Sequence, residues 1–314
     1  MSAQSIATGK RRLLDVGRLP RIQNVRHVVQ AAFVLFILYA TVLHIVVGEN
    51  GPVVTASPEA YCPFGGFETL YKYITSGGKF VSHAHLSNLM LFLGVLLVTV
   101  VARGAFCGWI CPFGTLQEWL YGFSAWLQKR VPVLGKAVRA LKARVNPKPT
   151  LVVGQPARRT VAQRLDHWLR YFKYVFLGWI IWGTVAYGVM VFREVDPWAA
   201  LLTITELEAY GGLLVLIIVA VAALFVERPW CRYACPLGAI IGVVGKISPL
   251  RIQREGAACS GCALCDRKCP VGIAVASATD ITDANCNMCL RCVDSCPKPG
   301  ALELKLVVPG MKAQ

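Results

Sequence analysis

The chain has 314 residues, of which 55% are hydrophobic and only 16% are charged. Its mean hydropathy is +0.53, which excludes an ordinary soluble protein and predicts a chain embedded in a membrane. The formal net charge is +16, but the excess lies in segments next to apolar stretches, so membrane topology explains it better than nucleic-acid binding does.

Four apolar segments are long enough, or nearly so, to cross roughly 30 Å of hydrocarbon. They cover residues 28–47, 86–101, 171–192 and 211–226. The second and fourth are short and need their flanks to complete a span. The first is too long for the core of a signal peptide and lacks a cleavage site, so we interpret it as an anchor. We expect a mainly α-helical membrane protein whose four transmembrane helices form two repeated hairpins.

Lysine and arginine are frequent in residues 1–27 and 103–170 and rare in residues 48–85 and 193–210. Because basic loops stay on the cytoplasmic side, we expect a multi-pass protein of the cytoplasmic (inner) membrane with both termini in the cytoplasm. The expected domains are a basic N-terminus at 1–27, a membrane domain at 28–250 with a cytoplasmic loop at 103–170, and a ferredoxin-like domain at 251–314.

The outer side carries a candidate quinone site. His44, His83, His85 and Glu68 combine histidine with carboxylate, which suits the release of protons during quinol oxidation. Histidines hydrogen-bonded to water or headgroups, or axial ligands of a b-type haem, are the alternatives. Cys62 lies in the same region; it could ligate a haem or help to shape a pocket, although a turn at the membrane face is the simpler interpretation.

An internal repeat joins the ends of the second and fourth spans. Each half has a basic residue, an aromatic residue and a Cys-x-x-x-Cys-Pro core that is followed by glycine. The repeat predicts that four cysteines converge at the cytoplasmic ends of these spans, namely Cys107, Cys111, Cys231 and Cys235. They could hold a third iron-sulfur cluster, work as redox dithiols, or pack as small buried residues.

The C-terminal region contains two copies of the pattern Cys-x-x-Cys-x-x-Cys-x-x-x-Cys-Pro, which is typical of paired [4Fe-4S] clusters. Disulfides or zinc sites are poor alternatives for two complete four-cysteine runs. Because the fourth cysteine of each run serves the other cluster, we assign the ligands crosswise. The first cluster takes Cys259, Cys262, Cys265 and Cys296, and the second takes Cys286, Cys289, Cys292 and Cys269.

Four spans, paired Cys-x-x-x-Cys-Pro motifs and two C-terminal ferredoxin motifs together resemble the NapH/MauN family of ferredoxin-type membrane proteins, which is related in architecture to NosR-type and CcoG-type proteins. The resemblance covers about residues 28–305. In the NapH branch it implies a quinol dehydrogenase component that passes electrons towards a reductase. The chain lacks the flavin domain of NosR-type proteins, and the Cys62 loop is not assigned to NapH itself.

The sequence therefore predicts a membrane-bound iron-sulfur electron-transfer subunit. It would link the quinone or menaquinone pool to iron-sulfur, cytochrome or flavin subunits of an oxidoreductase complex, without nucleic acid. The alternative is a redox assembly factor for a respiratory or amine-oxidising metalloenzyme. A scaffold with purely structural clusters is a third possibility.

Overall fold

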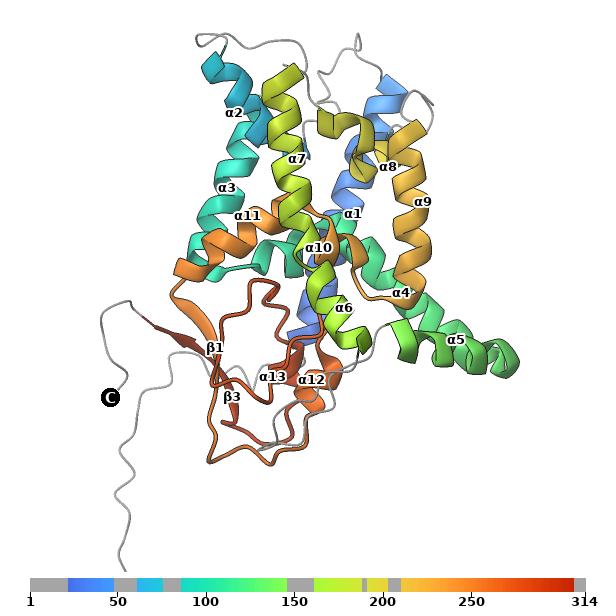
Figure 1. The fold of residues 1–314 in the computed structure, drawn as a ribbon, viewed down its shortest axis with the longest axis vertical. Helices are drawn as coiled ribbons and strands as arrows, with labels where there is room; N and C mark the ends of the chain where they lie inside the picture. The colour runs from blue at the N-terminus through green and yellow to red at the C-terminus, as the bar shows by residue number, and fades with distance from the viewer. Residues whose placement is uncertain are drawn as a thin grey trace, which may run out of the picture.

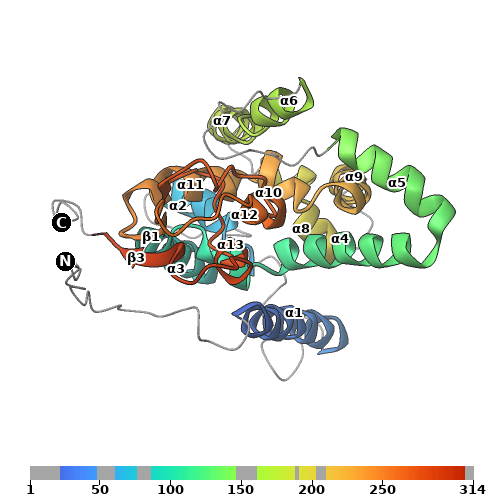
Figure 2. The ribbon, with the colours of Figure 1, turned by 90° about the horizontal axis from the view of Figure 1, so that it is seen from below.

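The computed structural model describes residues 22–47, 61–75, 86–145, 161–187, 191–202 and 210–307. Helices dominate, and four long apolar ones run roughly side by side above a small C-terminal domain (Figure 1). These helices are α1 (Ile22–Val47), α3 (Leu86–Ala102), α7 (Phe172–Tyr187) and α9 (Tyr210–Phe225). Seen from below, α1 lies along one side and α7 along the other (Figure 2).

The four apolar helices agree with the predicted segments except at two ends. Helix α1 begins at Ile22, earlier than expected. Helix α7 ends at Tyr187, and residues 191–195 form the 3-10 helix η4 (Val191–Val195), so a continuous helix to residue 192 was wrong. Among the described residues, α1 is the helix that is both long and apolar enough to cross a membrane, whereas α3 and α9 are apolar but shorter.

The described residues of the segment 103–170, which the sequence predicts to be a cytoplasmic loop, are mostly helical. The segment contains the π-helical turn η3 (Phe106–Ile110), α4 (Pro112–Arg130), α5 (Pro132–Val145) and α6 (Val161–Leu169). Helix α4 packs against α9 and α1. It buries the polar side chains of Gln117 and Glu118, which need partners inside the fold. Helix α4 of this segment therefore packs into the core of the fold.

Each repeat consists of an apolar helix, a cysteine motif and a second helix. The first repeat joins α3, η3 and α4, and the second joins α9, α10 (Pro229–Tyr233) and α11 (Pro236–Val244) with the short turn η5 (Gly245–Ile247). The second helix of each repeat packs on the apolar helix of the other, α4 on α9 and α11 on α3. Arg103 and Arg228 occupy matching left-handed positions, each with φ of 55°. This exchange brings the two motifs to the centre of the molecule.

The other described elements lie at the two ends of the bundle. Helices α2 (Gly65–Thr75) and α8 (Pro197–Leu202) lie at the end away from the C-terminal domain (Figure 1). Gly66 is required where α2 packs on α3, because a Cβ there would lie 2.2 Å from the Asn88 carbonyl oxygen.

The C-terminal domain is a small antiparallel sheet with two short helices. Its strands are β1 (Leu250–Arg254), β2 (Asp280–Ile281) and β3 (Leu302–Leu306), in the order β2-β1-β3. Ile252 of β1 pairs with Ile281 on one side and Leu304 on the other, and it is almost fully buried. Helices α12 (Leu264–Lys268) and α13 (Arg291–Asp294) carry cysteines of the two runs.

Candidate functional site

The four repeat cysteines hold equivalent places in the two repeats. Cys107 lies in η3 and Cys231 in α10, while Cys111 and Cys235 are the N-cap residues of α4 and α11. A proline follows each N-cap cysteine at the start of the helix, where its missing N–H costs nothing. The Gly238 N–H donates to Cys235 Sγ at 3.3 Å. The Cys-Pro pairs therefore begin helices and direct their thiols inwards.

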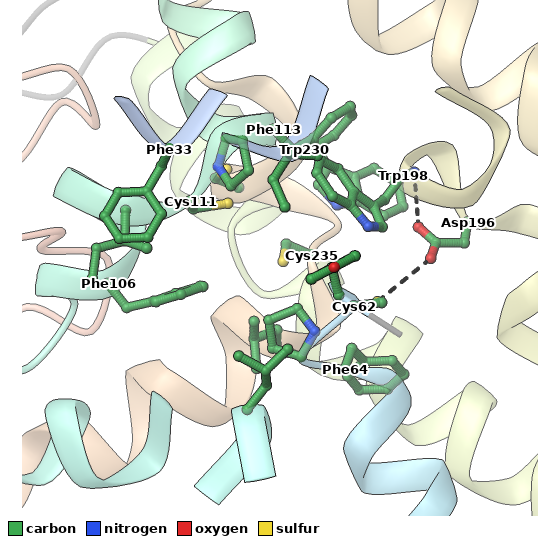
Figure 3. A pocket seen from close by; sticks show the side chains of 18 of the residues that line it. Phe33, Cys62, Phe64, Phe106, Cys111, Phe113, Asp196, Trp198, Trp230 and Cys235 are labelled. Atoms are coloured by element: carbon green, nitrogen blue, oxygen red, sulfur yellow. Dashed lines mark hydrogen bonds between the residues drawn. The ribbon is translucent and has the colours of Figure 1, made fainter. Parts of the chain in front are cut away.

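The structure brings these four cysteines together. Cys111, Cys231 and Cys235 line one pocket (Figure 3). Burial raises the pKa of all four thiols, and charge on Cys111 raises the pKa of the other three further. Among the described residues, no three histidine, cysteine, aspartate or glutamate side chains lie close enough to hold a single metal ion. The four thiols suit a polynuclear cluster, whose irons separate the ligands, or two dithiol pairs.

The C-terminal cysteine runs share one backbone conformation. In each run the two residues that flank the second cysteine have positive φ. These residues are Gly261 and Ala263 in the first run and Met288 and Leu290 in the second. Three of the four are not glycine, and L residues adopt this region only where the surrounding structure enforces it. The backbone thus forms two matched cradles of a kind that a cysteine-ligated cube requires.

Cys269 lies with the second run rather than with its own. Burial, together with the nearby Cys289 and Cys269, raises the pKa of Cys286 to about 12. Cys269 also raises the pKa of Cys292. The Ile273 N–H donates to Cys269 Sγ at 3.4 Å. This placement suits the crosswise ligand assignment, in which Cys269 completes the second cluster.

The first repeat and the second cysteine run touch through their backbones. A Cβ on Gly104 would lie 2.5 Å from the Cys286 carbonyl oxygen, and a Cβ on Gly108 would lie 2.1 Å from that of Asn287. No side chain larger than hydrogen fits at either position. Trp109 Nε1 donates to the Met288 carbonyl at 2.9 Å. Cys107 therefore lies on the segment that packs against the second cluster loop.

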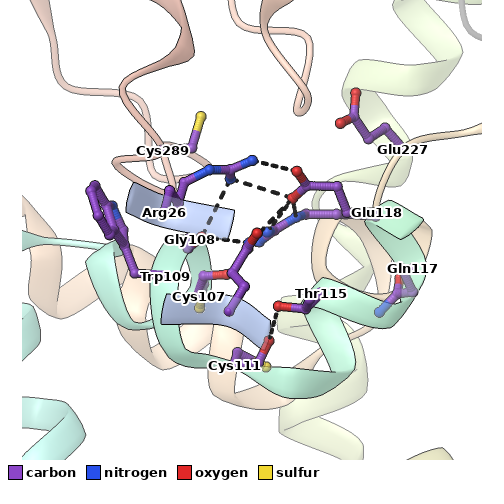
Figure 4. A network of polar contacts seen from close by, with 12 residues as sticks. Arg26, Cys107, Gly108, Trp109, Cys111, Thr115, Gln117, Glu118, Glu227 and Cys289 are labelled. Atoms are coloured by element: carbon purple, nitrogen blue, oxygen red, sulfur yellow. Dashed lines mark hydrogen bonds and ion pairs between the residues drawn. The ribbon is translucent and has the colours of Figure 1, made fainter. Parts of the chain in front are cut away.

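A buried network of charges surrounds this contact (Figure 4). Glu118 of α4 accepts from Arg228 at 2.6 Å and also pairs with Arg26 and Arg291. Arg291 also pairs with Glu227. Burial would raise the pKa of Glu118, but the three guanidinium charges outweigh it and lower the pKa to about 2. Three positive and two negative charges leave an excess of positive charge beside the cysteines, which favours thiolate ligands.

The comparisons with known proteins match this arrangement. The family model described as a 4Fe-4S binding domain matches residues 84–133 and 208–255, which are the two repeats with their four cysteines. Ferredoxin-type protein NapH of Haemophilus influenzae is 27% identical over 229 residues, 68% of this chain and 67% of that protein. The chain is therefore similar to the NapH-like ferredoxin-type proteins.

Other relatives of this NapH-like chain differ in length. YccM of Escherichia coli, named for a proposed role in electron transport, is 28% identical over 80% of this chain and 64% of its own length. Protein NirI of Paracoccus denitrificans is 31% identical over 63% of this chain but only 25% of its own length. The chain thus spans less than two thirds of these two relatives. No solved structure matches it.

Of the four residues predicted for a quinone site, the structure describes His44 and the backbone of Glu68. His44 lies in the last turn of α1, half-buried, and does not line the pocket beside the cysteines. His83 and His85 lie outside the described residues. Glu68 lies on α2, and its side chain is outside the description. The site predicted from these residues stays a prediction.

Cys62, by contrast, lines the same pocket as three of the repeat cysteines. Its Sγ lies 3.7 Å from Asp196 Oδ2, and the neighbouring Tyr61 packs edge-on against Phe36 of α1. The alternative in which Cys62 helps to shape a pocket therefore agrees with its position better than a simple turn does.

The sequence reasoning missed two groups of polar residues. Glu118 had a signal, because it is the one acidic residue between positions 103 and 165 of a strongly basic segment. Asp196 and Trp198 had none, since an Asp-Pro-Trp sequence is ordinary at a helix start. Only the tertiary structure places both side chains in the pocket lining (Figure 3).

Proposed function

We propose that this NapH-like protein is a membrane-embedded electron-transfer subunit that links the quinone pool to a redox partner through iron-sulfur clusters. One observation carries the proposal: the repeat cysteines lie between an apolar pocket and the second cluster loop, with Gly104 and Gly108 in backbone contact with that loop. The four thiols thus occupy the place that a relay between a membrane-dissolved donor and the ferredoxin-like domain would need.

The C-terminal runs would hold two [4Fe-4S] clusters with the crosswise ligands given above. The matched left-handed backbone of both runs and the position of Cys269 support this assignment. The four repeat cysteines would hold a third cluster, and the convergence of their thiols supports it. When bound, the clusters supply one-electron carriers.

The protein's own residues would position these carriers and influence their reduction potentials. The glycine contact keeps Cys107 close to the Cys286 to Cys289 loop. Arg26, Arg228 and Arg291 supply positive charge that favours an added electron nearby, because electrostatic interactions are strong in a buried site. Arg103 donates from Nη1 to the Ile281 carbonyl at 2.9 Å and holds the ferredoxin-like domain against the first repeat.

A membrane location is supported by the surfaces of the four apolar helices. Large apolar side chains are exposed along α1, α3, α7 and α9, and a soluble protein rarely exposes such continuous surfaces. Examples are Leu35, Leu97, Trp182 and Leu214. Because basic residues are concentrated at the end that carries the cysteine runs, we place this end in the cytoplasm and the helices in the inner membrane.

The first test is the iron and acid-labile sulfide content per chain after anaerobic purification. Two cubic clusters require about eight irons, and a third requires a clear excess over that value. Cys111→Ala should lower the iron content above about eight per chain and leave the irons of the two C-terminal clusters in place. Unchanged iron with lost electron transfer would assign the repeat cysteines to dithiol chemistry instead.

The second test is reduction of the clusters by a menaquinol analogue. We expect cluster reduction by quinol in the purified protein, with dithionite as the control that measures all reducible clusters. A protein that dithionite reduces but no quinol reduces would contradict the link to the quinone pool. That result, together with thiol reactivity at the repeat cysteines, would favour an assembly factor that reduces a metal or a thiol in another protein.

A further inference from the structure

A cavity of about 170 Å³ lies beside the repeat cysteines (Figure 3). Its walls are almost entirely apolar and aromatic, with Phe106, Phe113, Trp198 and Trp230 among them. A cavity of about 150 Å³ accepts benzene, so this one has room for a six-membered ring. Aromatic walls favour a flat ring, which can stack or pack edge-on against them.

The cavity is also lined from the lipid-facing side. Phe33 and Phe36 of α1 contribute to its wall, and they are 38% and 52% exposed. Both belong to the long apolar helix, which also exposes large hydrophobic side chains such as Leu35, Leu38 and Tyr39. A ligand dissolved in the membrane could therefore enter beside α1 without crossing water.

One wall carries a hydrogen-bond donor that lacks a partner. Trp198 Nε1 is buried and has no hydrogen-bond partner among the described residues. A buried N–H without a partner is rare and costly, and a ligand oxygen would satisfy it. Cys62 and the repeat cysteines do not fill this role in the part of the chain that the structure describes.

A carboxylate lies two residues from this donor. Asp196 is 6% exposed, and its Oδ1 accepts from the Trp198 backbone N–H at 2.9 Å at the start of α8. Its other oxygen, Oδ2, accepts from the Cys62 thiol at 3.7 Å in the pocket wall (Figure 3). The pocket therefore offers an N–H that donates and a carboxylate that accepts. One phenolic hydroxyl can satisfy both, because it accepts through its oxygen and donates through its hydrogen.

We propose that this cavity is the quinol site, with the head-group ring between the aromatic walls and one hydroxyl bound by Trp198 and Asp196. The inference rests on the proposed function and deepens it, and it moves the site from His44, His83, His85 and Glu68 to the cysteine side. Cys111, Cys231 and Cys235 also line this cavity, so the ring would lie beside the proposed relay.

At this site a quinol would be oxidised to a quinone. The quinol loses two O–H hydrogens as two protons and two electrons, and its two C–O bonds become carbonyls. Asp196 takes the proton of the bound hydroxyl, and the second proton leaves to water. The two electrons would be taken up one at a time by oxidised iron-sulfur clusters, which the cysteines of this protein would hold and which would thereby be reduced.

The test uses the full chain with its clusters in lipid nanodiscs and duroquinol, a one-ring quinol, as the electron donor. Trp198→Phe keeps the ring but removes the donor, so the KM for duroquinol should rise about 5–10-fold, as for one lost hydrogen bond. Asp196→Asn keeps the shape but removes the base, so the maximal rate should fall at least tenfold while KM changes little. Trp182→Phe, on the exposed face of α7, is the matched control and should behave as wild type.

The readouts separate failure of the site from failure of the function. If duroquinol reduces the wild type and both pocket variants equally well, the quinol binds elsewhere and the proposal is wrong. If dithionite reduces the wild type but duroquinol does not, the proposed function itself fails, and the site with it. If Trp198→Phe does not retain its clusters, Asp196→Asn decides, because an unchanged rate in that variant overturns the proposal.

Discussion

The two sets of cysteines in this protein are built in different ways. The C-terminal eight lie within one short stretch, and their loops adopt a left-handed backbone that the local sequence repeats twice. The repeat cysteines come from two segments far apart in the chain, and they meet only because α4 packs on α9 and α11 on α3. A local site depends on its own loop, whereas an assembled site depends on every contact that brings its parts together.

Loss of a C-terminal ligand should give the largest and most local effect. Cys265→Ala removes one of three cysteines in the first loop, so about four of the irons should be lost while the repeat cysteines keep any metal they hold. Iron content and electron paramagnetic resonance of the reduced protein measure this. Cys111→Ala, from the other set, is the matched variant and should leave the C-terminal clusters intact; loss of the C-terminal cluster signals in both variants would contradict the separation of the two sets.

Glu118→Gln should disturb the assembled site without touching a cysteine. Removing one partner of a buried ion pair costs about 3–5 kcal/mol, and Glu118 faces three arginines from α1, α13 and the segment before α10. The thermal midpoint should fall by several degrees, and the repeat cysteines should become accessible to a maleimide. Glu255→Gln, at an exposed position directly after β1, is the control.

The effect of Glu118 on stability should depend on pH in one direction. Its pKa is lowered from 4.5 to about 2 in the folded protein, so its stabilisation is fully present above about pH 4.5. It is lost as the pH falls from there towards 2, because the unfolded chain then binds the proton more readily than the folded protein does. The difference in thermal midpoint between wild type and Glu118→Gln should be constant from pH 8 to 5 and shrink below that range.

Gly108→Ala should separate the two cysteine sets while leaving each intact. A Cβ there would lie 2.1 Å from the Asn287 carbonyl oxygen, so the second cluster loop must move. Overpacking of this kind costs about 1–3 kcal/mol. We expect unchanged iron but slower reduction of the C-terminal clusters by quinol. Gly122→Ala on α4 has open space around its Cβ and is the matched control; equal rates in both variants would show that electrons do not pass through this contact.

The smallest effect should come from the hydrogen bond between α10 and α6. Tyr233 Oη donates to Asp166 Oδ1 at 2.6 Å, and Asp166 also holds Arg232 at 2.6 Å beside the loop after Cys269. Tyr233→Phe removes one hydrogen bond and should cost about 1 kcal/mol of unfolding free energy. Tyr39→Phe on the exposed face of α1 is the control. Equal thermal midpoints for the two variants would show that this hydrogen bond adds nothing to docking.

The amino-acid sequence alone predicted the helical character, the position of the apolar segments and the cysteine motifs. Apolar runs and cysteine spacing are local patterns, and local patterns determine helices and ligand loops. The repeat itself was visible at Cys107 and Cys231 because both halves kept the same residues at the same spacing. The family followed from these motifs, and the comparisons agree with it.

Only the tertiary structure decided which distant residues meet. The burial of Glu118 among three arginines, the contact of Gly108 with Asn287, and the pairing of Asp196 with Cys62 join residues that are far apart in the chain. No local pattern encodes such contacts, because they depend on how α4 and α11 exchange partners between the repeats. Spacing along the chain therefore determined the ligand loops only in the C-terminal domain. Packing determined the pocket, the charges around it and its position beside the repeat cysteines.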